Sequence, residues 1–267
     1  MKTTRLVSLV FAFCATAHIA QDAAADIQGF GDFSQFAYNH SDNGSPPTVS
    51  PGIITITDGG GQEGRSLFYN TPQNITSFTV SFRYQIPSGS ATVFDFDPSA
   101  AFVIQNSPQG VHAVGSGGET FAYSGITNSA AVSLQLGGNG ATGSSGTGLF
   151  TGGIVSTAMS TSPVLLTLGH PVDVVLSYNG STLTETLRDT VTSTEFSKSY
   201  LTNLVNAIGG NTAYVGFTAA TDNSGFQPPQ SQTLSNFHFA NVPEPGSFFL
   251  AALALLALVG FRLRRTA

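Results

Sequence analysis

The chain has few charged residues for its length. Only 9% of its 267 residues are Asp, Glu, Lys or Arg, against about a quarter in typical soluble domains. Hydrophobic residues make up 41%, so the chain lacks the low hydrophobicity and high net charge of disordered proteins. Basic residues are scarce and scattered outside the two ends of the chain. This argues against nucleic acid as a partner, because phosphate contacts need clustered Lys and Arg.

The single cysteine, Cys14, lies in a segment that we expect to be removed. Lys2 and Arg5 precede an apolar stretch, and the alanines at 23–25 supply the small residues that a signal peptidase recognises. Residues 1–25 are therefore predicted to be an export signal. The mature chain then has no cysteine, which excludes disulfides, zinc–thiolate sites and cysteine nucleophiles.

Helical periodicity is almost absent from the body of the chain, and alternation with a period of two takes its place. In SFTVSFRYQIP (77–87), apolar residues alternate with Ser, Thr, Arg and Gln, which places the apolar set on one face of a strand. In PVDVVLSYNGSTLTETLRD, two such runs flank Asn179 and Gly180, a strong hairpin signal. Similar runs are GIITIT, AAFVIQN, AAVSLQL, TAYVGFTAAT and LSNFHF. The sequence predicts one all-β domain, an antiparallel β-sandwich, over residues 26–241.

Spacings that would indicate catalysis are also lacking. A glycosidase on such a sandwich needs two carboxylates about 5 to 10 Å apart. The glutamates of the body lie in polar or loop contexts, where we expect them to be solvated; they are Glu63, Glu119, Glu185 and Glu195. Asp95 and Asp97 share one strand face, but they fit the end of a strand equally well. No Gly-x-Ser-x-Gly serine is present for a triad. We therefore expect no catalytic residue.

The last 26 residues, 242–267, have an organisation of their own. Pro243, Glu244 and Pro245 precede an uncharged apolar run, Phe248–Phe261, which as a helix would be about 21 Å long. Three arginines then follow, and basic residues at that place keep their end of a membrane segment cytoplasmic. They are Arg262, Arg264 and Arg265. We predict a short C-terminal transmembrane helix; a buried core helix, the alternative, leaves the arginines unexplained.

Together with the export signal, this order of parts resembles the tail of bacterial PEP-CTERM proteins. The resemblance implies processing near Pro243–Pro245 by an exosortase, a membrane transpeptidase of bacteria that make exopolysaccharide. The tail would be held in the inner membrane before it is cut, and the protein would then reach the cell surface or the extracellular matrix.

The body resembles the L-type (legume-type) lectin domain. The resemblance rests on the order GRSLFYNTPQNITSFTVSFRYQI, AAFVIQN, GGETFAYSGI, NSAAVSLQL, the Asn-Gly hairpin and GGNTAYVGFTAATDNSG. It implies a concanavalin A-like jelly roll in which loops at one end hold a monosaccharide. In the family, Ca and a transition ion brace those loops.

The family's metal ligands are replaced in this chain. The Glu and Asp of the family's Val-Glu-Phe-Asp strand fall on Ser133 and Gln135, and the third carboxylate falls on Gly143. Hard cations need several anionic oxygens. We therefore expect no metal and no other cofactor.

The family's sugar site is matched only in part. Its sugar-binding Asp is either displaced by one position, to Asp97, or lost, while Asn139 falls on a sugar-contacting asparagine. Gly118, beside Gly117, lies near the family's backbone-donor glycine, and the AATDNSG loop supplies Asp222. The sequence thus favours a non-catalytic protein that binds exopolysaccharide or another glycan. The alternatives are a structural or adhesive matrix protein that has lost sugar binding and, third, a glucanase-like enzyme.

Overall fold

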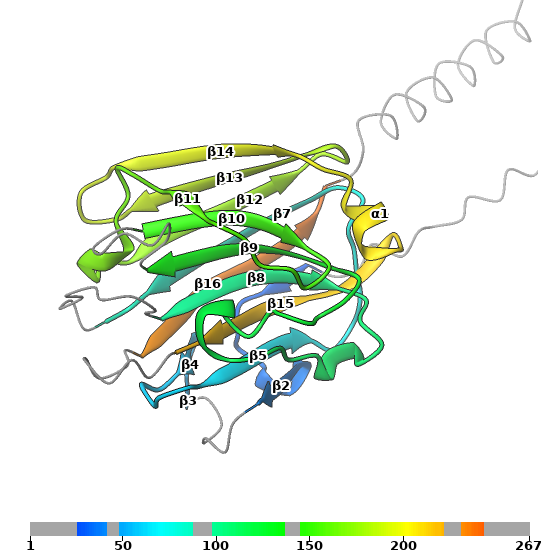
Figure 1. Cartoon of the computed structure of the whole chain (residues 1–267), viewed down its shortest axis with the longest axis horizontal. Helices are drawn as coiled ribbons and strands as arrows, with labels where there is room; N and C mark the ends of the chain where they lie inside the picture. The colour runs from blue at the N-terminus through cyan, green and yellow to red at the C-terminus, as the bar shows by residue number, and fades with distance from the viewer. Residues whose placement is uncertain (1–25, 42–47, 88–97, 137–144, 222–230, 243–267) are drawn as a thin grey trace, which may run out of the picture.

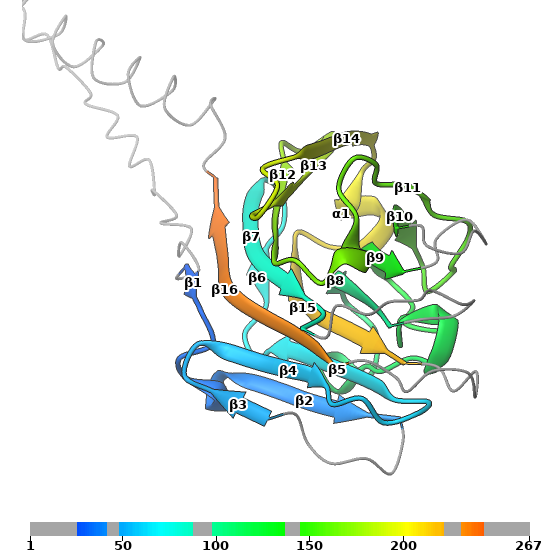
Figure 2. The same cartoon turned by 90° about the vertical axis from the view of Figure 1, so that its left-hand side faces the viewer.

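The computed structural model describes residues 26–41, 48–87, 98–136, 145–221 and 231–242. Within them, two antiparallel β-sheets pack face to face (Figures 1 and 2). This confirms the prediction of an all-β antiparallel sandwich. No helix in the described ranges is long and apolar enough to cross a membrane. The predicted signal at 1–25 and the predicted membrane helix at 248–261 lie outside these ranges.

The first sheet has the strand order β14-β13-β12-β7-β16-β4-β3, with β1 paired to β16. These strands are β14 (Glu195–Leu201), β13 (Thr182–Asp189), β12 (Val172–Tyr178), β7 (Phe78–Gln85), β16 (Gln232–Asn241), β4 (Ile53–Thr57), β3 (Thr48–Ser50) and β1 (Ile27–Gln28). The second sheet has the order β11-β10-β9-β8-β15-β5-β2, with β6 paired to β15. These are β11 (Met159–Ser160), β10 (Ser145–Thr151), β9 (Ser129–Leu136), β8 (Ser99–Gln105), β15 (Thr212–Ala220), β5 (Gly64–Tyr69), β2 (Phe36–His40) and β6 (Gln73–Asn74).

The alternating patterns form strands because each buries one face. Along β7, every second residue is buried, and the residues between them are half-exposed. The predicted hairpin joins β12 to β13, which pair in register from Tyr178 and Leu183 onward. Gly180 adopts a positive φ of 94°. The side-chain oxygen of Asn179 accepts hydrogen bonds from the backbone N–H groups of Ser181 and Thr182. The turn therefore uses glycine for its backbone and asparagine for its hydrogen bonds.

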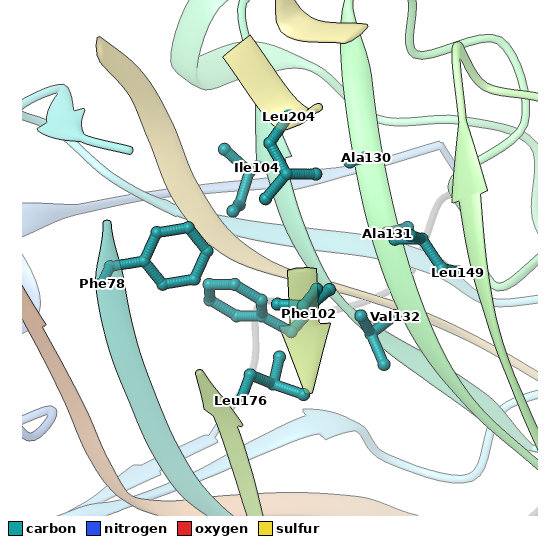
Figure 3. Close-up of a pocket in the computed structure, with 10 residues that line it drawn as sticks. Phe78, Phe102, Ile104, Ala130, Ala131, Val132, Leu149, Leu176 and Leu204 are labelled. Carbon is teal, nitrogen blue, oxygen red and sulfur yellow. The ribbon is translucent and has the colours of Figure 1, made fainter. Parts of the chain in front are cut away.

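The main core lies between the sheets and is rich in phenylalanine. Phe217 packs edge-on against Phe82, Phe102 and Phe237, with ring centroids 4.9 to 5.6 Å apart. A small void remains between Phe78 and Phe102 (Figure 3), with a volume of about 10 Å³. That is room for about one water molecule, and its lining is apolar. The void is a packing defect of the core and is too small to bind a ligand.

A second, smaller core covers the outer face of the second sheet. Phe68, Val103 and Phe150 point outward from β5, β8 and β10, and Phe121 and Tyr123 pack on them from the connection between β8 and β9. That connection contains two short 3₁₀ helices, η2 (Gly110–His112) and η3 (Gly118–Thr120). The covered face explains why β5 and β8 are buried along almost their whole length.

The two ends of the sandwich differ. At one end, which we call the tail end, β16 finishes at Asn241, opposite Phe78 of β7, and β1 enters beside it. A short helix, α1 (Leu204–Ile208), joins the sheets there (Figure 1, right). The opposite end, the loop end, is formed where β4, β9 and β15 finish and where β5, β8, β10 and β16 begin (Figure 1, left).

Candidate functional site

The candidate site lies at the loop end, where the strands flanking the predicted sugar-binding residues meet. Three of those residues lie outside the described ranges: Asp97, Asn139 and Asp222. Their strands, however, are neighbours in the second sheet. Ser99, at the start of β8, pairs with Gln135 of β9 on one side and with Ala220 of β15 on the other. The chain therefore leaves the sheet toward all three predicted residues from three adjacent strands.

Gly117 and Gly118 reach the same end from η3. A Cβ atom on Gly117 would lie 3.0 Å from the carbonyl oxygen of Glu63, so this position has little room for a side chain. Gly118 has a φ of 73°, a conformation that favours glycine. The N–H of Glu63 donates to Thr221 Oγ1, and the N–H of Thr221 donates to the carbonyl of Glu63, both at 3.1 Å. Glu63 thus links Gly117 to the residue before Asp222.

The positions of the family's metal ligands carry no charge here. Ser133 and Gln135 share one face of β9, and the amide of Gln135 donates to Ser133 Oγ at 2.9 Å. Gly143 lies outside the described ranges. In the part of the chain that the structure describes, no group of three or more His, Cys, Asp or Glu could hold a metal ion. A hydroxyl bonded to an amide does not fit a calcium ion, which takes several anionic oxygens.

Glu63 is buried, and the prediction that it is solvated is wrong. Arg65 donates to Glu63 Oε1 at 2.9 Å, and both side chains are at most 3% exposed. Arg65 also donates to the hydroxyl of Tyr38 at 2.5 Å. Burial, together with a hydrogen bond to Asp58, raises the pKa of Glu63 to about 7, although Arg65 acts in the opposite direction. Because residues 63, 65 and 67 alternate, all three point toward the other sheet.

Glu185 is also buried, contrary to the same prediction. It lies on β13 between Leu183 and Leu187 on the inward face, and it ties the two sheets together. Thr147 of β10 donates to it at 2.7 Å, and Tyr200 of β14 donates at 2.9 Å. Burial raises the pKa of Glu185 to about 7, while these hydrogen bonds act to lower it. Glu63 and Glu185 are both enclosed by the fold, so neither is placed to act on a substrate.

A pH dependence of stability follows from Glu185. Its pKa is higher in the folded chain than its ordinary value of 4.5. The stability that the protonated Glu185 contributes to the folded chain is therefore fully present below about pH 4.5 and is lost as the pH rises through about 7. We expect Glu185→Gln to reduce the fall in the free energy of unfolding between pH 5 and 8 by up to about 3 kcal/mol.

Urea denaturation at pH 5, 6, 7 and 8 measures this effect. The pKa of Glu63 is also raised, but Glu63 is present in both the wild type and Glu185→Gln. The difference between their two pH profiles therefore reports Glu185 alone. Glu195→Gln is the matched control, because the Glu195 side chain is 62% exposed. An unchanged pH profile for Glu185→Gln would show that this carboxyl group is ionised throughout.

Comparison with known proteins agrees with this architecture. A family model described as the PEP-CTERM protein-sorting motif matches residues 241–265. No curated protein sequence matches the chain. The fold is similar to lectin II from Ulex europaeus, with a TM-score of 0.64 and 16% identity over 82% of this chain and 100% of that one.

Two further solved structures show the same fold. The lectin from Bauhinia forficata in complex with GalNAc has a TM-score of 0.64 and 14% identity over 82% of this chain and 98% of that one. The metal-free form of lectin I-B4 from Griffonia simplicifolia has a TM-score of 0.63 and 14% identity, with 82% of this chain and 100% of that one covered. The chain therefore carries a PEP-CTERM protein-sorting motif behind a body with the concanavalin A-like fold of the legume lectins.

Proposed function

We propose that this exported protein is a non-catalytic carbohydrate-binding protein that is sorted through its C-terminal tail. The observation that carries the proposal is the meeting of three adjacent strand ends with η3 at the loop end. Ser99 pairs with Gln135 and with Ala220, and Gly117 rests on the backbone beside Gly64. A glycan would therefore contact Asp97, Asn139 and Asp222 together with the glycine pair.

The chemistry of the predicted residues suits sugars. Carboxylate and amide groups on short side chains offer fixed acceptors and donors for paired hydroxyl groups. The Bauhinia lectin binds GalNAc on the same fold. Because no metal would fix the loops in this chain, binding has to order them, at a cost of about 0.5–1.5 kcal/mol per immobilised side chain. We expect weak single-site affinity that becomes useful when many copies line a polysaccharide.

The tail supplies the route to the surface. The sorting motif matches from residue 241, which is also the last residue of β16, so the sorting tail begins where the last strand of the body ends. We propose that residues 1–25 are the cleaved signal, 26–241 the lectin-like domain and 242–267 the sorting tail. An exosortase-type transpeptidase would cut near Pro243–Pro245 while the apolar segment and the terminal arginines hold the chain in the inner membrane.

A structural or adhesive role in the matrix is the second candidate. The pair Ser133 and Gln135 favours it, because a lectin that lost its metal ligands could also have lost its sugar. An enzyme is the third candidate and has less support, since Glu63 and Glu185 are buried and engaged in structural hydrogen bonds.

A glycan array probed with the mature protein tests the proposal. We expect the same glycans to be bound with calcium present and with a chelator present. The chelator is expected to leave the melting temperature within about 2 °C, because a bound stabilising metal would contribute RT ln(1 + [L]/Kd). Binding that the chelator abolishes would contradict the metal-free site. No binding at high protein density would favour the structural role.

A further inference from the structure

The tail end of the sandwich is nearly free of ionisable side chains. Five of its described segments, 69–78, 126–129, 151–154, 178–183 and 200–213, contain no ionisable residue apart from tyrosine, while the segment after β8 adds His112 near this end. The N-terminal segment adds Asp26 and Asp32 to this end, and His238 of β16 lies 4.0 Å from Asp26. Asparagine, serine, threonine and glycine take the place of charged residues there. We call these five segments the tail-end surface.

The opposite half of the sandwich carries most of the charge that the structure describes. At its surface are His40, Asp58, Arg83, His170, Asp173, Arg188 and Glu195, and Glu63, Arg65 and Asp189 are buried beneath it. Strand register places them there: Arg83 lies opposite Asp173, which lies opposite Arg188. The two ends of one domain thus present different surfaces to their surroundings.

The tail-end surface also exposes two large aliphatic side chains. Leu201, at the end of β14, is 89% exposed, and Ile154, after β10, is 73% exposed. They come from different sheets, and strand register places both at the tail end, since Leu201 pairs with Thr182 and Ile154 follows Thr151, which pairs with Ala130. Apolar side chains that enter the boundary between headgroups and acyl chains contribute to binding at a lipid interface.

The length of chain beyond the fold limits what this surface can meet. Val242 is still tied to the body, because its N–H donates to the carbonyl of Ser77. Only residues 243–247 separate it from the apolar run that begins at Phe248, and five residues span at most about 18 Å. The ten residues of β16 extend for about 33 Å in the opposite direction. Only the tail end can therefore approach a bilayer that holds the apolar run.

We propose that the tail-end surface rests against phospholipid headgroups while the tail is still attached. This inference rests on the proposed insertion of the tail into the membrane. Asparagine, serine and threonine can bond to headgroup oxygens without the desolvation cost of a charge, and Leu201 and Ile154 reach the boundary of the acyl chains. The loop end is then held away from the membrane, where it meets glycans.

Site-specific probes on the uncut chain test the proposal. Single cysteines would be introduced as Leu201→Cys, Ile154→Cys and Val191→Cys in a Cys14→Ser background and labelled with a fluorophore. Val191 is the matched control, because it is 63% exposed and lies in the turn after β13 at the loop end. The whole chain would be made in a bacterium without the transpeptidase and placed in phosphatidylcholine–phosphatidylglycerol vesicles with spin-labelled headgroups.

We expect quenching at residues 154 and 201 to exceed that at 191 by at least about threefold, since only a surface at the interface lies within reach of the headgroups. Equal quenching at all three residues, with the chain bound to the vesicles, would overturn this inference and leave the proposed function standing. A chain that does not bind the vesicles would overturn both the inference and the proposed membrane stage of sorting.

Discussion

Replacement of Glu63 by alanine is expected to lower the free energy of unfolding by about 3–5 kcal/mol at pH 8. Arg65 is 1% exposed, and its guanidinium group stays protonated under all ordinary conditions. Glu63 lies 2.9 Å from it, and pH 8 is above the pKa of Glu63, about 7. Removing the carboxylate takes from this buried positive charge the ion-pair partner that lies 2.9 Å away.

Asp173→Ala is the matched control for this prediction. It removes the carboxylate that pairs with Arg83, where the two side chains are 35% and 41% exposed, so we expect a loss of no more than about 1 kcal/mol. Replacing both buried partners, as Glu63→Leu with Arg65→Met, should recover much of the lost stability. Denaturant unfolding of the four proteins measures these differences. A double variant as unstable as Glu63→Ala would contradict a loss caused by the broken ion pair of Arg65.

The strands were predictable because their burial alternates with a period of two. In β7 and in the β12–β13 hairpin, one face packs on the core and the other meets solvent, and the sequence alternates accordingly. The covered strands do not alternate. Ser99–Gln105 is buried along its whole length, because the connection between β8 and β9 packs on its outer face, and a continuous apolar run is ambiguous in sequence.

The burial of the two glutamates was missed, although a signal for it is present. Glu185 lies between Leu183 and Leu187 in TLTETLRD, and the period of two places all three on one face. A glutamate within an apolar face is accepted only when partners from elsewhere satisfy it. Here those partners are Thr147 and Tyr200, from other strands, and a sequence does not show which distant side chains will meet.

The candidate site was predictable only to the level of its supporting strands. Ser99, Gln135 and Ala220 are placed by sheet register, which the alternating pattern specifies. The positions of Asp97, Asn139 and Asp222 depend instead on loops with little periodicity. Their roles came from resemblance and remain predictions.

Loss of sugar binding is the second large effect that we expect. Asn139→Ala and Asp222→Ala each remove a short polar side chain from the loops at the loop end, and each should weaken binding by about tenfold, which corresponds to about 1.4 kcal/mol. That value is within the range of one to two hydrogen bonds to a sugar hydroxyl. Neither change touches the described core, so the melting temperature should stay unchanged.

The central claim is that the loop end of this sandwich binds a glycan, and binding to the immobilised exopolysaccharide of the host bacterium tests it most directly. Wild type, Asn139→Ala, Asp222→Ala and the control Asn206→Ala would be compared at equal density; Asn206 is an exposed asparagine of α1 at the tail end. We predict binding by wild type and by Asn206→Ala, and about a tenfold loss for each loop-end variant. Undiminished binding by both loop-end variants, or no binding by wild type at high density, would contradict the claim.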